Sequence, residues 1–175
     1  MSRLKIQDIE DANEEVKGIY KKLTDEMGTV LNIFKGMANS PAAFKAFLSF
    51  HNELQKGELA AAEREVIALT TAQLNDCQYC LAAHTSIAES VGISRDEAFK
   101  IRKGEPLDSK HLALANFARE VIETNGLIID DTLSAIREAG YSDGQIVEII
   151  ACIALNFFTN IFNHVNDTEL DFSPV

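Results

Sequence analysis

The sequence predicts an all-α protein, and three observations support that fold class. Apolar residues recur at spacings of three and four, and the two-residue alternation that is typical of strands is nearly absent. Gly and Asn residues stand at intervals that suit the ends of helices. The 175 residues are 46% hydrophobic, which is enough to bury a continuous core without disulfides or structural metals. We therefore expect a single domain over residues 1–175.

Start and stop signals divide the N-terminal half into four predicted helices. The first should cover roughly residues 6–27, and an irregular stretch that runs through Met37 should follow it. Ser40 caps the second helix, and Gly57 ends it. The next two helices are expected over residues 58–75 and 77–92.

Two capping boxes organise the C-terminal half. In the first box, Ser94 and Glu97 start a short helix that should end near Gly104, before the break at Pro106. The second box, at residues 142–145, starts the last helix of the chain. Between the short helix and the last one, helices are expected over about 109–124 and 130–139.

The last helix, about 142–168, is apolar almost all round. Such a helix lies either at the centre of a domain or in a buried subunit interface, so we expect a homo-oligomer. The residues that carry chemistry lie in a catalytic core of about 40–125. The tail after the last helix, TELDFSPV, has the composition of an extended arm.

A gapless internal match links the cysteine region to the last helix. If it is a repeat, the domain contains two related helical hairpins, of which the first alone kept reactive residues. The alternative is a coincidence between two apolar helices, whose periodic patterns match one another easily. The match aligns Glu65, Cys77, Cys80 and His84 with Gln145, Phe157, Asn160 and His164.

Charge and composition exclude several classes of function. The net charge is -11, and Lys and Arg never cluster, so a nucleic-acid partner is not expected. The N-terminal residues are acidic where a secretory signal needs an apolar stretch, and nowhere do 18 apolar residues run together. We expect a cytoplasmic protein without a membrane partner. In such a reducing compartment, a C-x-x-C pair indicates redox chemistry or a metal site.

The reactive residues gather at the start of the predicted helix 77–92. Cys77 and Cys80 lie one turn apart, and His84 follows one turn later on the same face. The start of a helix favours a thiolate, which is the nucleophilic form of cysteine. His84 is placed to accept a proton from Cys80, and Glu65, a carboxylate in apolar sequence on the preceding helix, is placed to hold the imidazolium.

Two arguments conflict about which cysteine attacks. Proximity to the helix N-terminus favours Cys77, whereas the one-turn spacing to His84 favours Cys80. The dipole contributes about 1 kcal/mol or less at an exposed position, while a hydrogen-bonded base removes the proton during the reaction. We therefore expect Cys80 to be the nucleophile.

Several residues have simpler interpretations. Cys152 stands in the most apolar helix and is expected to be a buried structural thiol. We expect His51 and His111 to be surface or capping residues, and His164 to be a satisfied polar residue at a helix end. A zinc site formed by the two cysteines with His84 and Glu65 is an alternative, although structural zinc sites usually recruit a second C-x-x-C or a His pair.

The motif E-x11-C-x2-C-x3-H resembles the signature of alkylhydroperoxidase D and the wider carboxymuconolactone decarboxylase superfamily. The match uses Glu65, Cys77, Cys80 and His84, and the helical layout resembles the family's over most of the chain. The resemblance implies an all-α fold, a homotrimer or homohexamer, and peroxidase or disulfide reductase activity. It also implies that Cys80 becomes the sulfenic acid, that Cys77 is the proton donor and resolving thiol, and that His84 and Glu65 form the relay. One departure is Tyr79, where the mycobacterial peroxidase has a second histidine.

We therefore expect a thiol-dependent peroxidase that reduces alkyl hydroperoxides through a redox-active Cys77–Cys80 disulfide, with no cofactor and no metal. Its partners would be the peroxide and an unidentified dithiol or protein reductant. Three alternatives remain. They are a thiol–disulfide reductase of a partner protein, a non-catalytic redox sensor, and a carboxymuconolactone decarboxylase, although that branch of the superfamily works without the thiol pair.

Overall fold

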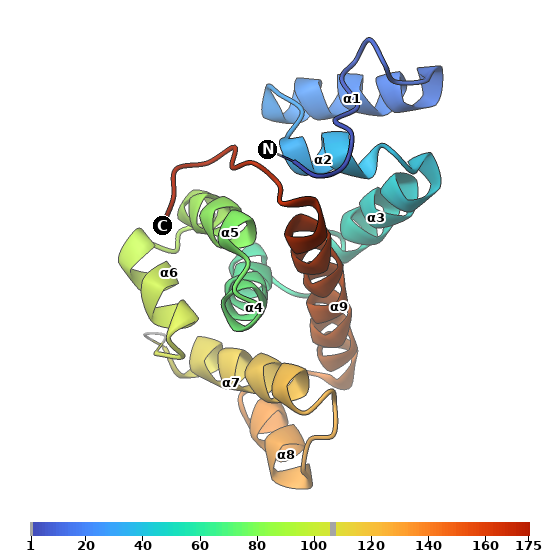
Figure 1. Cartoon of the computed structure of the whole chain (residues 1–175). Helices are drawn as coiled ribbons and strands as arrows, with labels where there is room; N and C mark the ends of the chain where they lie inside the picture. Colours follow the sequence, from blue (N-terminus) through green and yellow to red (C-terminus); the bar gives the residue numbers. More distant parts are fainter. Residues whose placement is uncertain (1, 106–107) are drawn as a thin grey trace.

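A computed structural model describes residues 2–105 and 108–175, and all regular secondary structure within these residues is helical. Figure 1 shows the helices arranged around α4, with the N-terminal helices set to one side. This confirms the predicted all-α fold class. The helices are α1 (Glu14–Met27), α2 (Asn32–Met37), α3 (Pro41–Leu54), α4 (Ala61–Leu74), α5 (Gln78–Ser90), α6 (Arg95–Arg102), α7 (Ser109–Glu123), α8 (Asp130–Glu138) and α9 (Asp143–Asn166).

Helix α4 is the centre of the larger of two apolar cores. Helices α5, α6, α7 and α9 all pack against it, so residues 66–72 in its middle are all buried. Val66, Ile67 and Leu69 have no exposed surface. A second core lies between α1, α2 and α3 and the start of α5, and it includes both cysteines of the C-x-x-C. The cysteine pair therefore sits where the N-terminal helices meet the central bundle.

The N-terminal region differs from the sequence-based expectation in two ways. The first helix begins at Glu14 rather than near residue 6, because the side chain of Asn13 caps it by accepting from the amide of Val16. Residues 32–37, expected to be irregular, form the short helix α2. Its N-cap, Leu31, makes no side-chain capping bond, so the sequence carries no start signal for this helix.

The capping signals located the other helices well. Ser40 caps α3, and the boxes at Ser94–Glu97 and Ser142–Gln145 cap α6 and α9. Helix α4 starts at Ala61, three residues later than expected, because the amides of residues 58 and 59 donate to the carboxylate of Glu148 on α9 instead. The expected break at Pro106 lies outside the described residues.

Helix α9 overturns the interpretation of the internal match as two related hairpins. Residues 65–84 form two helices separated by a turn, whereas the matching residues 145–164 lie in one unbroken helix. The match therefore reflects periodic apolar sequence. By length and composition α9 could cross a membrane, but a core helix of a soluble protein meets the same criterion.

Both chain ends return to the C-terminal end of α9. The backbone amide of Arg3 donates to the carbonyl of Asn166, and the amide of Leu4 donates to the side chain of the same asparagine. The C-terminal arm then runs from α9 past the start of α5 (Figure 1). There Asp171 accepts a hydrogen bond from the amide of Asn32 on α2. The arm thus ties α2 to the helix that carries the cysteines.

Candidate active site

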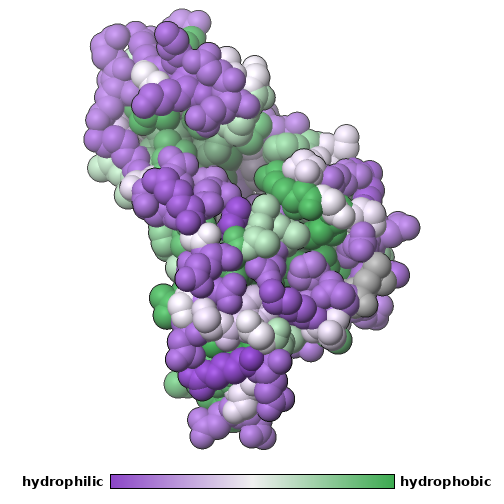
Figure 2. All heavy atoms as spheres, turned by 180° about the vertical axis from the view of Figure 1, so that it is seen from behind, coloured by the Kyte–Doolittle hydropathy of each residue, from purple (hydrophilic) through white to green (hydrophobic). Residues whose placement is uncertain are grey.

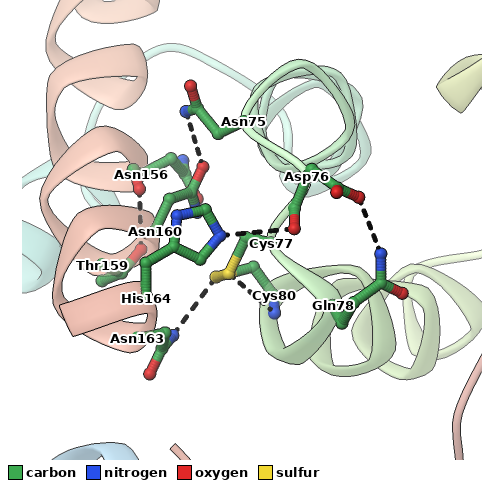
Figure 3. Close-up of a disulfide and its surroundings, with 10 residues drawn as sticks. All are labelled: Asn75, Asp76, Cys77, Gln78, Cys80, Asn156, Thr159, Asn160, Asn163 and His164. Atoms are coloured by element: carbon green, nitrogen blue, oxygen red, sulfur yellow. Dashed lines mark hydrogen bonds between the residues drawn. A yellow bond between two sulfur atoms is a disulfide. The ribbon is translucent and has the colours of Figure 1, made fainter. Parts of the chain in front are cut away.

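Cys77 and Cys80 are joined in a disulfide at the start of α5 (Figure 3). A tight turn separates α4 from α5, with Asp76 in the left-handed region at a φ of 51°. Cys77 is the N-cap of α5, and its sulfur accepts from the amide of Cys80 at 3.3 Å. Their exposed fractions are only 1% and 3%. The turn therefore places both sulfurs at the positive end of a helix and away from bulk water.

Glu65 and His84 meet across the contact between α4 and α5. The Nδ1 atom of His84 lies 2.8 Å from Oε2 of Glu65, and both side chains are largely buried. Burial lowers the pKa of His84, but the charge and the hydrogen bond of Glu65 outweigh burial, so the net shift of the pKa is upward. The expectation that Glu65 lies toward His84 is met, and the pair can hold a proton close to the cysteines.

A cavity of about 160 Å³ opens beside this constellation. Figure 2 shows the molecule hollowed between the N-terminal helices and the rest, with apolar residues around the hollow. Glu65, Cys80 and His84 line the cavity, whereas Cys77 is not in its wall. Cys80 is thus the cysteine that a small molecule in the cavity would meet. The larger apolar side chains of the wall are those of Leu31, Ile33, Phe34, Phe47, Leu54, Ile87 and Leu155.

Sequence reasoning missed several polar residues of the cavity wall. His51 on α3, expected at the surface or in a cap, is half-buried in the wall, and burial lowers its pKa. Arg64 lies beside it and bonds the carbonyl of Leu59 and the side chain of Gln55. Helix α9 contributes further polar groups that no local motif marks. They are Asn156, Thr159 and Asn163.

Asn163 makes a direct contact with the reactive pair. Its Nδ2 atom donates to the sulfur of Cys80 at 3.3 Å (Figure 3). The two residues are 83 positions apart in the chain. The sequence offered one signal for this contact, an asparagine on the buried face of an apolar helix, because a buried amide needs a hydrogen-bond partner.

Cys152 is buried and makes no disulfide, as expected of a structural thiol. Burial raises its pKa to about 11, so it stays protonated near neutral pH. Its side chain nevertheless forms part of the cavity wall, which its sequence context did not suggest.

Tyr79, inside the C-x-x-C, is held by the C-terminal arm. Its hydroxyl donates to Oδ2 of Asp171 at 2.5 Å, and the ring of Phe172 packs edge-on against it. Burial and the neighbouring carboxylate raise the pKa of Tyr79. A phenol held in this way serves packing and not proton transfer.

The other two histidines do not enter the site. His164 is exposed and lies 3.3 Å from the carbonyl of Asp76, as expected of a satisfied polar residue at a helix end. His111 pairs with Asp108 at the start of α7. Within residues 2–105 and 108–175, no three His, Cys, Asp or Glu side chains lie close enough together to hold a metal ion.

Comparisons with known proteins agree with this geometry. Residues 41–105 match the sequence profile of the carboxymuconolactone decarboxylase family. This segment contains the whole constellation from Glu65 to His84. No curated protein sequence matches the chain.

Solved structures share the fold over nearly the whole chain. One is a peroxidase-related protein from Ralstonia eutropha JMP134, described as an alkylhydroperoxidase AhpD core. It matches with a TM-score of 0.90 at 24% identity, and the match covers 97% of this chain and 92% of the Ralstonia chain. A peroxidase-related protein from Silicibacter sp. TM1040 has a TM-score of 0.84 at 22% identity, covering 99% and 90%. A variant of the debrominase Bmp8 bound to 2,3,4-tribromopyrrole has a TM-score of 0.80 at 17% identity, covering 98% and 94%. At these identities the likeness concerns the fold alone.

Proposed function

We propose that this chain, whose residues 41–105 match the carboxymuconolactone decarboxylase family and whose fold is shared with peroxidase-related proteins, is a thiol-dependent peroxidase for organic hydroperoxides. One observation carries the proposal. Cys80 and the Glu65–His84 pair line the same apolar cavity, while Cys77 is bonded to Cys80 and lies outside the cavity wall. A small molecule in the cavity would thus meet the nucleophile and the proton relay, while the resolving thiol reaches Cys80 from outside the cavity wall.

The proposed cycle starts from the reduced protein. The Cys80 thiolate attacks the terminal oxygen of the hydroperoxide, so a sulfur–oxygen bond forms and the oxygen–oxygen bond breaks. The leaving alkoxide takes a proton from the His84 imidazolium and departs as the alcohol. The Cys77 thiol then displaces water from the Cys80 sulfenic acid and closes the disulfide. A dithiol or protein reductant, still to be identified, returns two electrons.

The Glu65–His84 pair supports this assignment of roles. Since Nδ1 of His84 is engaged by Glu65 and Nε2 makes no hydrogen bond within the described residues, Nε2 is available for the reacting groups. The carboxylate raises the pKa of His84 despite burial and so favours the protonated imidazolium. A proton donor to an alkoxide must carry that proton.

The cavity favours a small apolar oxidant over a protein. Its wall is mostly aliphatic and aromatic, and Cys80 is only 3% exposed. A disulfide on a partner protein is larger than this cavity of about 160 Å³, so it would reach the sulfur only if the cavity wall rearranged. We therefore rank thiol–disulfide reduction of a protein behind peroxide reduction.

The proposal includes the cellular location and the oligomeric state of the protein. A disulfide that must be reduced back to the dithiol after each turnover fits the cytoplasm, where reductants keep thiols reduced. We also propose a homotrimer or homohexamer, because α9 leaves apolar side chains exposed along one face. These are Val147, Ile150, Phe158, Ile161 and Val165.

The proposed function is tested by rapid mixing of the reduced protein with one equivalent of oxidant. Cumene hydroperoxide should oxidise it faster than hydrogen peroxide, 2,3,4-tribromopyrrole or a small disulfide. With the hydroperoxide, Cys77→Ser should accumulate a trappable sulfenic acid at Cys80, and Cys80→Ser should react no faster than an ordinary exposed thiol. Mass spectrometry that finds the sulfenic acid on Cys77 in the Cys80→Ser protein, formed at the wild-type rate, would reverse the assignment. Faster reaction with the bromopyrrole than with the hydroperoxide would contradict the proposed peroxidase activity and indicate a dehalogenase instead.

A further inference from the structure

Asn163 lies on the face of α9 that meets the start of α5. Its side chain is 4% exposed, and its Nδ2 atom donates to the sulfur of Cys80. Figure 3 shows the amide pointing at the disulfide from the opposite helix. A donor aimed at a sulfur stabilises the anionic form of that sulfur more than the neutral form. The contact therefore favours the reactive thiolate of Cys80 once the disulfide is reduced.

The other end of the same amide lacks a partner. The Oδ1 atom of Asn163 is buried and makes no hydrogen bond within the described residues. An unpaired buried oxygen is costly, and such groups in native proteins call for an explanation. Three other buried side-chain atoms of the described chain are also unpaired, but their residues do not line the cavity. They belong to Thr70, Thr85 and Asn160.

We propose that Asn163 is a substrate-binding residue whose amide holds the two reacting groups together. Nδ2 donates to the Cys80 thiolate, while the free Oδ1 accepts the O–H of the hydroperoxide and orients its terminal oxygen toward the sulfur. This inference rests on the proposed peroxidase function and adds a residue that lies outside the E-x11-C-x2-C-x3-H motif. It also defines the substrate by its chemistry, as a hydroperoxide with a free O–H group and an apolar body.

The proposed role moves no proton onto Asn163. The sulfur–oxygen bond forms as the oxygen–oxygen bond breaks, so Cys80 is oxidised by two electrons and the hydroperoxide is reduced. The alkoxide takes its proton from His84, and the O–H bonded to Oδ1 stays on the oxygen that becomes the sulfenic acid. The same amide therefore binds the substrate before the step and the sulfenic acid after it.

The test separates thiolate stabilisation from peroxide binding. In a Cys77→Ser background, Cys80 is reacted with iodoacetamide and with cumene hydroperoxide over a range of pH. Asn163→Leu removes both amide atoms at similar size, and Asn163→Ala removes them without filling the space. Both variants should shift the pH midpoint of alkylation upward. At pH values above that midpoint, their rate with hydroperoxide should fall about tenfold or more relative to their rate with iodoacetamide, because one hydrogen bond to the reacting group is lost.

Asn160→Leu is the matched control. Asn160 lies on the same helix and is also buried, but its Oδ1 atom accepts a hydrogen bond from the side chain of Asn75, and it does not line the cavity. This variant should leave the ratio of the two rates unchanged. Thermal melting followed by circular dichroism shows that each variant is folded.

Three outcomes would overturn the inference. They are an equal loss of both rates in the Asn163 variants, no loss in either rate, or a loss with leucine alone, which would indicate that the side chain fills the cavity. Failure of the proposed function looks different. In that case the background protein itself reacts with the hydroperoxide no faster than a small thiol, while the upward shift of the alkylation midpoint still tests the contact between Asn163 and Cys80.

Discussion

Two opposing effects of its surroundings set the pKa of His84, the histidine of the proposed relay. Burial lowers the pKa of His84, and the carboxylate of Glu65 at 2.8 Å raises it by charge and by hydrogen bonding, with a net upward shift. Because the folded-state pKa is raised, the pair contributes stability that is fully present below the pKa of histidine in the unfolded chain. That contribution is lost as pH rises through the folded-state pKa.

Replacing Glu65 by Gln should therefore reverse the balance at His84. With the charge gone, burial dominates and the pKa of His84 should fall below its ordinary value, which an NMR titration of the imidazole signal would show. The rate of hydroperoxide reduction near neutral pH should fall about 100-fold, a usual loss when general acid catalysis is removed. Glu97→Gln, at the exposed cap of α6, is the control and should change neither quantity. An unchanged titration would remove Glu65 from the relay.

At the scale of elements, the site depends on how closely α2 approaches α9. Gly36 on α2 faces the ring of Phe162, and a Cβ atom at this glycine would lie 2.9 Å from that ring. The short helix carries Ile33 and Phe34 in the cavity wall, next to Leu31. The close approach therefore sets the distance between one wall of the cavity and the helix that holds Asn163.

Gly36→Ala should destabilise the protein by about 1–3 kcal/mol, because the added methyl group overpacks a closed contact. Gly18→Ala is the matched control. Gly18 is an exposed position in α1 where an added Cβ atom would meet nothing within 4 Å, so alanine there should stabilise the protein by about 0.5–1 kcal/mol. Urea unfolding of the three proteins gives both values. Equal effects of the two substitutions would show that the approach of α2 to α9 is not tight.

At the scale of the whole molecule, α9 has one buried face and one face exposed to solvent. One face packs on α3, α4, α5 and α7, and the opposite face leaves apolar side chains in solvent over the length of the helix. Such a continuous exposed apolar surface is typical of an interface between subunits. We therefore expect the subunits of the proposed oligomer to contact one another through this face of α9.

Ile161→Glu places a charge on that exposed face, where Ile161 is 53% exposed in the isolated chain. We expect the wild-type protein to scatter light as a trimer or hexamer at micromolar concentration and the variant to scatter as a monomer, since burying an unpaired carboxylate is costly. Leu127→Glu, at an even more exposed apolar position beyond α7, should leave the assembly intact. A wild-type protein that is already monomeric would refute the proposed assembly.

The sequence by itself determined the features that depend on a few neighbouring residues. Ser40, Ser94 and Ser142 mark helix starts because a cap acts within one turn. The positions of Cys77, Cys80 and His84 on one face of α5 follow from helical periodicity for the same reason.

Only the tertiary structure decided which distant groups complete the site. Helix α2 has no capping bond of its own and packs closely against α9, so no local signal announces it. The sequence predicts a surface or capping role for His51, but α3 forms a wall of the cavity and carries His51 into it. Asn163 reaches Cys80 from 83 positions away along the chain, through the packing of α9 against α5. The physical reason is that burial and hydrogen bonding between distant helices depend on how all the helices pack, which no short stretch of sequence specifies.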